Sequence, residues 1–73
     1  MKINLNSIEK VKRFVEVAST FEDPIDLSVG RFMVDGKSIL GIFSLDLREP
    51  LEVVTYGGKE EAEILMAVRA FAA

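Results

Sequence analysis

The first twenty residues show two spacings of apolar side chains, one typical of a strand and the other of a helix. Apolar and polar residues alternate over 2–5, which predicts a short strand whose odd-numbered residues face the core. Asn6 or Ser7 follows as a candidate N-cap, and Asn6 with Glu9 has the spacing of a capping box. Steps of three and four then predict an amphipathic helix over about 8–20, with the inward stripe Ile8, Val11, Phe14, Val15, Ala18 and Phe21.

Residues 25–29 and 32–35 form two strand-like runs that are separated only by Gly30-Arg31. A glycine followed by another residue suits a type II′ turn, because the first central position of that turn needs a positive φ. Pro24 ends the preceding helical pattern, since proline disfavours helical geometry in the residue before it. The two runs therefore predict an antiparallel hairpin.

The second half of the chain predicts a helix, a strand and a closing helix. Ser38 precedes a very apolar run over 39–45 and is a candidate N-cap for a short helix there. Residues 51–56 have the composition and length of a strand. Acids followed by good helix formers predict a helix over about 59–71, whose expected inward stripe is Ala62, Leu65, Met66 and Arg69 or Ala70.

The predicted order is βαββαβα, an order whose first six elements are shared by ferredoxin-like folds. A central hairpin and short connections favour one four-stranded antiparallel sheet covered on one face by three helices. The sequence therefore predicts an α+β open-faced sandwich. A chain of 73 residues has room for one small core, so we expect a single domain over 1–73.

The composition excludes several kinds of chemistry. The 73 residues contain no cysteine and no histidine, so they offer no thiolate nucleophile, no imidazole ligand, no Ser-His-Asp triad and no histidine phosphoryl acceptor. The formal net charge of -3 argues against nucleic acid as a partner, because phosphate neutralisation needs surplus Lys and Arg. No apolar run approaches the roughly 20 residues of a membrane span. We expect a cytoplasmic protein without a metal or cofactor that has no nucleic-acid or membrane partner.

Residues 36–45 carry a more specific signal than the spacing of apolar residues does. They read Gly-Lys-Ser-Ile-Leu-Gly-Ile-Phe-Ser-Leu. This run resembles the regulatory-serine segment of the phosphocarrier HPr family of the sugar phosphotransferase system, where the pattern is Lys-Ser-Ile-Met-Gly-Val-Met-Ser-Leu or close to it. From Phe14 through Leu47 the chain follows that family without a gap, and the element order agrees throughout. The resemblance implies an HPr-like fold.

The functional centre of the family departs from its pattern in this chain. HPr proteins carry Gly-(Leu/Ile/Met)-His-(Ala/Thr)-Arg-Pro before the first helix, where the histidine receives phosphate and the arginine steadies it. Here the histidine position falls on Ser7, the arginine position on Glu9 and the proline position on Lys10. The loop is also about four residues shorter. These departures argue against histidine phosphotransfer and predict no catalytic residue, so the protein is expected not to be an enzyme.

Ser38 matches the serine that an ATP-dependent kinase phosphorylates in HPr proteins of Gram-positive type. The resemblance extends to the catabolite-repression HPr proteins, which keep this serine, lack the histidine and act as regulators. A phosphate there would add about -1.5 to -2 charge at the positive end of a helix. The resemblance therefore implies regulatory phosphorylation of Ser38 by an HPr-kinase-like enzyme. Ser38 is equally compatible with a purely structural role as an N-cap.

The helix after Ser38 carries more apolar residues than a two-turn helix can bury on a sheet. The family resemblance implies an exposed patch that engages a protein partner, made of Lys37, Ile39, Leu40 and Phe43. The alternative is that all the apolar side chains pack inside or in a homodimer contact. The oligomeric state stays open.

Three functions remain at this point. The first is a non-catalytic regulatory or docking module of the phosphotransferase type, switched at Ser38. The second is a phosphocarrier that uses a residue other than histidine. The third is an HPr-shaped domain with an unrelated structural or oligomerisation role.

Overall fold

The computed structural model describes all residues, 1–73, and contains the elements in the predicted order. Two longer α-helices, a short one and four strands make up the fold, and a 3-10 turn follows the last helix. Their bounds are β1 Lys2–Ile3, α1 Ile8–Ala18, β2 Asp26–Val29, β3 Phe32–Asp35, α2 Ile39–Phe43, β4 Leu51–Val54, α3 Glu61–Val68 and the 3-10 turn Arg69–Phe71.

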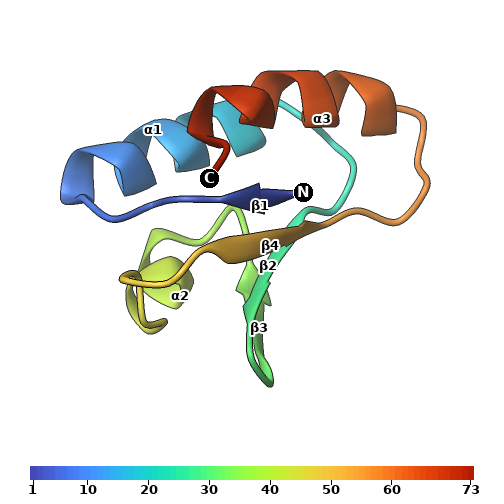
Figure 1. Ribbon diagram of the computed structural model, residues 1–73. Helices are drawn as coiled ribbons and strands as arrows, with labels where there is room; N and C mark the ends of the chain where they lie inside the picture. The colour runs from blue at the N-terminus through green and yellow to red at the C-terminus, as the bar shows by residue number, and fades with distance from the viewer.

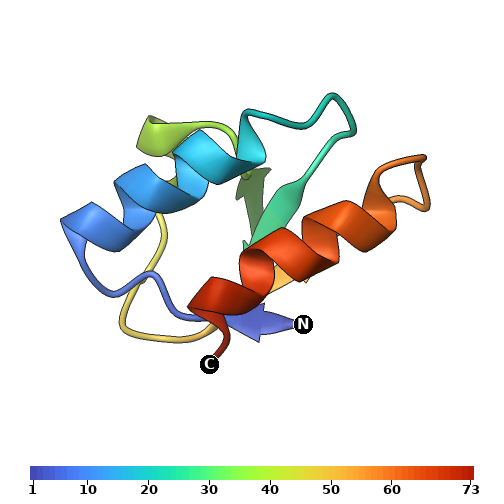
Figure 2. The same cartoon turned by 90° about the horizontal axis from the view of Figure 1, so that it is seen from above.

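The four strands form one antiparallel sheet in the order β1-β4-β2-β3. Helices α1 and α3 lie side by side over one face and run in roughly opposite directions, while α2 lies lower, near β3 (Figures 1 and 2). The other face of the sheet carries no helix (Figure 1). The predicted open-faced sandwich is confirmed.

The central hairpin forms as the sequence predicts. Strands β2 and β3 pair antiparallel, with Val29 opposite Phe32 across the two-residue turn. Gly30 has a φ of 59°, whereas Arg31 has no positive φ. Only the first central residue needs the left-handed region in a type II′ turn, so the glycine stands where the turn requires it.

Three strands are shorter than the sequence predicts. Strand β2 begins at Asp26 rather than at residue 25, and β1 and β4 are shorter because their ends bond elsewhere. Residues 2–5 give only Lys2–Ile3, since the backbone N–H of Asn4 donates to the carbonyl of Phe71 at 2.8 Å. Residues 51–56 give only Leu51–Val54, because the Thr55 hydroxyl turns to Glu61 at 2.5 Å. In both places a contact with the C-terminal part of the chain replaces the ladder.

Helix α1 begins at the serine that the sequence offered as one of two caps. The Oγ of Ser7 accepts from the backbone N–H of Lys10 at 3.1 Å, whereas the Oδ1 of Asn6 accepts from the Nζ of Lys10. The capping box on Asn6 is therefore wrong. Ile8, the first residue of the helix, was predicted to face inward but is 65% exposed. The helix also ends at Ala18 rather than 20.

The predicted inward stripe of the closing helix is wrong. Ile64, Val68 and Phe71 are buried, whereas Met66 is 67% exposed and Ala62, Arg69 and Ala70 are also exposed. The helix has apolar residues at nearly every position, so spacing alone did not identify a face. The buried set follows an i, i+4, i+7 stripe of branched and large side chains, which fill more of the core than alanine does.

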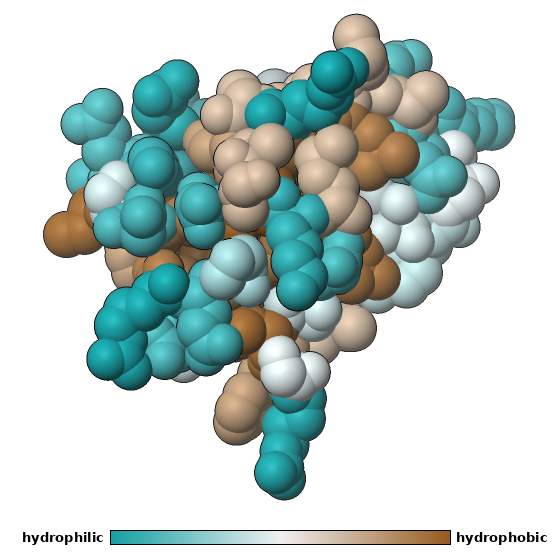
Figure 3. All heavy atoms as spheres, in the orientation of Figure 1, coloured by the Kyte–Doolittle hydropathy of each residue, from teal (hydrophilic) through white to brown (hydrophobic).

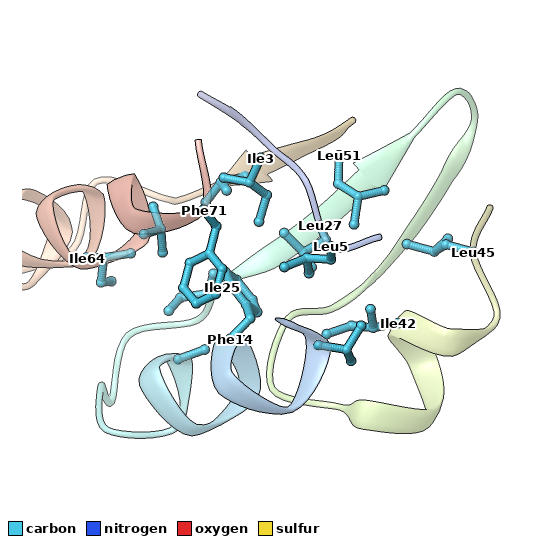
Figure 4. Close-up of a cluster of buried hydrophobic side chains, with 14 residues drawn as sticks. Ile3, Leu5, Phe14, Ile25, Leu27, Ile42, Leu45, Leu51, Ile64 and Phe71 are labelled. Carbon is cyan, nitrogen blue, oxygen red and sulfur yellow. The ribbon is translucent and has the colours of Figure 1, made fainter. Parts of the chain in front are cut away.

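One cluster of fourteen buried apolar residues joins the sheet to the three helices, and no polar or charged side chain is buried with it. Phe14 of α1 meets Phe71 edge-on, with ring centroids 5.5 Å apart. Figure 4 shows these two rings at the centre of the cluster and Ile42 of α2 at its side, beneath Leu45. Helix α2 is therefore attached to the core mainly through one side chain.

Candidate functional site

Ser38, which precedes α2, is held by hydrogen bonds of both its side chain and its backbone. Its Oγ accepts from the backbone N–H of Gly41 at 3.1 Å, and its own N–H donates to the carbonyl of Asp35 at 3.1 Å. A Cβ on Gly41 would lie 3.2 Å from that Oγ and 3.4 Å from the Cβ of Val34. A glycine inside a helix is normally unfavourable, but here it lets the helix pack closely on the serine and on β3. The Ser38 side chain remains half-exposed.

The residue before the serine is held by the chain itself. The Nζ of Lys37 donates to the carbonyl of Phe21 at 2.7 Å, and its backbone N–H donates to Oδ1 of Asp35 at 2.8 Å. Lys37 is half-buried rather than free in solvent. The ammonium group therefore ties the start of α2 to the first half of the loop that follows α1. The sequence pattern around Lys37 and Phe21 contained no signal for this contact.

The outer face of α2 carries two exposed apolar side chains. Leu40 is 80% exposed and Phe43 is 41% exposed. Ile39, the third apolar member of the predicted patch, is half-buried and packs against the core. Ile42 points inward and is fully buried. A helix of five residues can turn only one stripe to the sheet, so Leu40 and Phe43 are left facing solvent.

Ser7, at the position of the family histidine, has a different setting. It is exposed and caps the eleven-residue α1, and Glu9 is the only acidic residue in that first turn. A small hollow of about 120 Å³ nearby is lined by Asn4, Lys10 and Arg13, together with Ala70, Phe71 and Ala72. No exposed large apolar residue other than Ile8 lies within three residues of Ser7.

The largest hollow in the structure lies at neither serine. It is an open groove of about 500 Å³ between the β2–β3 turn and the segment after α2, lined by Val29, Gly30, Arg31, Phe32, Ser44, Leu45, Asp46 and Glu49. Arg48 and Asp46 form an exposed ion pair of 2.9 Å beside it, and the Arg48 guanidinium holds the pKa of Asp46 below its ordinary value. The hydroxyl in the lining, that of Ser44, donates to the carbonyl of Gly41 at 2.6 Å.

Figure 3 shows how the apolar and polar side chains share the surface in the view of Figure 1. Brown and tan atoms reach the surface among teal ones over the helices at the top and again at the lower end of the hairpin.

Tyr56 follows β4, and its hydroxyl donates to Asp26 of β2. This hydrogen bond raises the pKa of Tyr56. No helix is long and apolar enough to cross a membrane.

An antiparallel β1-β4-β2-β3 sheet under two long helices, with a short serine-capped helix leading from β3 to β4, is the architecture of phosphocarrier proteins of the HPr type. The chain belongs to the HPr family, because residues 9–73 match the family described as "PTS HPr component phosphorylation site". The family consists of phosphocarrier and regulatory proteins of the phosphotransferase system, and its members interact with other proteins of that system.

Two solved structures are similar to this chain. The HPr of Thermoanaerobacter tengcongensis is 28% identical, with a TM-score of 0.80 over 94% of this chain and 78% of that one. The catabolite-repression protein Crh of Bacillus subtilis, described as an intertwined dimer with a swapped domain, is 26% identical, with a TM-score of 0.75 over 96% of this chain and 80% of that one. No curated protein matches the chain.

Proposed function

We propose that this protein is a regulatory docking module of the phosphotransferase system that carries no phosphoryl group on histidine, binds a protein partner through α2 and is switched at Ser38. The observation that carries the proposal is the exposure of Leu40 and Phe43 on the helix that Ser38 caps. A half-exposed hydroxyl beside two solvent-facing apolar side chains combines a modifiable group with a binding surface.

The composition supports the absence of histidine relay chemistry. A relay needs a nitrogen nucleophile that forms a transferable N–P bond, and these 73 residues contain no imidazole. Ser7 at the family position would give a phosphoester, which is far less transferable. Glu9 at the position of the family arginine would place an anion near the bound phosphate, and like charges at such a distance repel.

Phosphorylation of Ser38 would change the character of the α2 surface. The kinase would join the γ-phosphorus of ATP to Oγ, release ADP and take the hydroxyl proton onto its own base. The new group carries about -1.5 to -2 charge and three acceptor oxygens, placed two residues before Leu40. The Nζ of Lys37 donates to the carbonyl of Phe21, which holds the ammonium group beside the loop after α1, and this one cation does not balance a nearly dianionic phosphate. The phosphorylated surface would therefore favour a partner that brings its own arginine.

A kinase assay with a matched control tests the proposal. HPr kinase and labelled ATP should label the wild type to one phosphate per chain, and Ser38→Ala should remain unlabelled. Ser7→Ala is the control, because it removes the other N-cap hydroxyl and should be labelled like the wild type. Absence of label in the wild type, or equal label in Ser38→Ala, would refute the switch and favour an unrelated structural role.

A second incubation tests the alternative of a phosphocarrier that uses another residue. With phosphoenolpyruvate, Enzyme I and labelled phosphate, the protein should take up no label. Stoichiometric uptake that a downstream acceptor can remove would establish a relay and overturn the proposal. Because the kinase uses ATP, the proposal also implies a cytoplasmic protein, and it treats residues 1–73 as one domain.

A further inference from the structure

The two edge strands of the sheet differ in whether their outer side is paired. Strand β1 pairs with β4 on one side and is covered on the other by the end of the chain, since Ile3 forms a bridge with Ala72 and the N–H of Ala73 donates to the carbonyl of Lys2 at 3.0 Å. Strand β3 pairs only with β2. The sheet therefore has one covered edge and one open edge.

The register of the hairpin identifies the groups on the open edge. Val29 and Phe32 flank the two-residue turn, and the N–H of Gly36 donates to the carbonyl of Ile25 at 2.7 Å. Antiparallel pairs alternate between bonded and non-bonded. The N–H and C=O of Met33, and the N–H of Asp35, therefore point away from β2 toward solvent.

This edge lacks most of the usual protections against pairing with another strand. Natural edges are blunted by proline, by a bulge, by a central charge or by shortness, and β3, with four residues, has only the last of these. Its middle consists of Phe32, Met33 and Val34, of which Phe32 and Met33 are more than half exposed. Charges stand only at the two ends, with Arg31 before the strand and Asp35 as its last residue.

We propose that β3 pairs with β3 of a second copy of this chain, antiparallel and centred on Met33, to join two sheets into one of eight strands. In this register Met33 lies opposite Met33 of the second copy, and their outward N–H and C=O groups exchange two hydrogen bonds. Phe32 lies opposite Val34 of the second copy. This alignment is the symmetric one for a two-fold axis, in which the same patch is used on both copies.

Charge complementarity selects this register and this occupant. Centring on Met33 places Arg31 opposite Asp35 of the second copy, and symmetry repeats the pair at the other end of the interface. Arg31 has no ion pair within its own chain. Asp35 uses Oδ1 to accept from Lys37 and has a second carboxylate oxygen for the arginine. Opposite charges directly across an antiparallel pair stabilise it, and like charges destabilise it.

The interface is short and separate from the docking face of α2. Four residues of β3 and one flanking arginine contribute from each copy, which puts the contact in the class of small, weak interfaces. Leu40 and Phe43 take no part, so the dimer does not depend on the proposed function of α2. The pairing also differs from a swapped dimer, because every strand stays in its own chain.

A charge-reversal cycle measured by sedimentation equilibrium, up to about 1 mM protein, tests the pairing. The wild type should dimerise reversibly. Arg31→Asp and Asp35→Arg should each raise the dimer dissociation constant about tenfold, because each replaces two attractive pairs with two repulsive ones. The double variant restores opposite charges and should return to within about threefold of the wild type. Circular dichroism checks that each variant is folded.

Met33→Lys provides an independent test, since it places two ammonium groups opposite each other at the centre and should abolish dimerisation. Met66→Lys, on the exposed face of α3, is the matched control and should leave it unchanged. A wild type that stays monomeric at every concentration overturns the proposal. A dimer that survives both Met33→Lys and the charge reversals also overturns it and points to another contact, such as a swapped strand.

Discussion

The starts of α1 and α2 use the same cap in different surroundings. In each, a serine Oγ accepts from the backbone N–H three residues on, and both distances are 3.1 Å. The surroundings differ: Ser7 is exposed and lies before an eleven-residue helix, whereas Ser38 is half-buried before a helix of five. The two serines therefore share their cap geometry and differ in exposure and in the length of the helix that follows.

The difference lies in how each helix is attached. Helix α1 buries Val11, Phe14 and Ala18, whereas α2 buries only Ile42. The short helix has too little core-facing surface for its apolar residues, so Leu40 and Phe43 remain outside. The comparison teaches that an exposed apolar face can arise because a helix is too short to bury the apolar residues that it carries.

The largest expected effect concerns recognition of α2. Leu40→Glu should lower kcat/KM for phosphorylation by HPr kinase by roughly 30-fold or more, because truncation or charge at a central apolar anchor costs about 2 kcal/mol or more. Ile8→Glu is the control, since Ile8 is an equally solvent-facing apolar residue next to the other serine. Equal losses in the two variants would show that the effect is not specific to α2.

The next effect concerns the single anchor of α2. Ile42→Ala should reduce the free energy of unfolding by about 2–5 kcal/mol, as removal of a fully buried branched side chain leaves a cavity. Ile8→Ala should change it by about 0.5 kcal/mol or less, as at an exposed site. Urea unfolding measures both. A small effect of Ile42→Ala would mean that α2 is held by contacts other than this side chain.

The caps themselves should be equivalent. Ser7→Ala and Ser38→Ala should each lower stability by about 1 kcal/mol, because each removes one bond of the same length to a backbone N–H. Thermal or urea unfolding of the two variants gives the comparison. If Ser38→Ala were neutral in stability but abolished phosphorylation, the cap role of Ser38 would be dispensable and only the modification role would remain.

The smallest effect is a pH dependence that neither serine can produce. Helix α3 starts without a side-chain cap bond, and Glu61 instead accepts from the Thr55 hydroxyl and from the N–H of Gly57, which lowers the pKa of Glu61. A lowered folded-state pKa stabilises above the ordinary value of about 4.5 and loses that contribution as pH falls through the lowered one. The Tm of the wild type should therefore fall more steeply below about pH 4.5 than the Tm of Glu61→Gln. Identical slopes would contradict this.

The sequence predicted the parts of the fold that depend on local pattern. The hairpin follows from Gly30-Arg31 between two alternating runs, and both serine caps follow from their place before apolar runs. The face of α3 did not follow, because nearly every position there is apolar and tertiary packing chose Ile64 and Val68. The length of α2 did not follow either, because the helix ends at Phe43, before the end of the apolar run, where the N–H and hydroxyl of Ser44 donate to the carbonyl of Gly41.

The surroundings of the candidate site depend on contacts distant in sequence. The bond from Lys37 to Phe21 joins residues sixteen apart, and no local pattern marks it. The close approach of Gly41 to Val34 and Ser38 left one trace, a glycine within a predicted helix, which signals close backbone packing once the helix is known. The sequence thus identified the types of residue at the candidate site, whereas the residues that they contact became known only from the three-dimensional structure.

The covered edge of the sheet has a consequence for synthesis. Strand β1 is made before both of its neighbours, which are β4, about fifty residues later, and the stretch from Phe71 to Ala73. Pairing across such separations delays folding until the intervening chain is made. The nascent chain therefore completes this side of the molecule only after its final described residues leave the exit tunnel, and a stalled shorter product would present β1 without either neighbour.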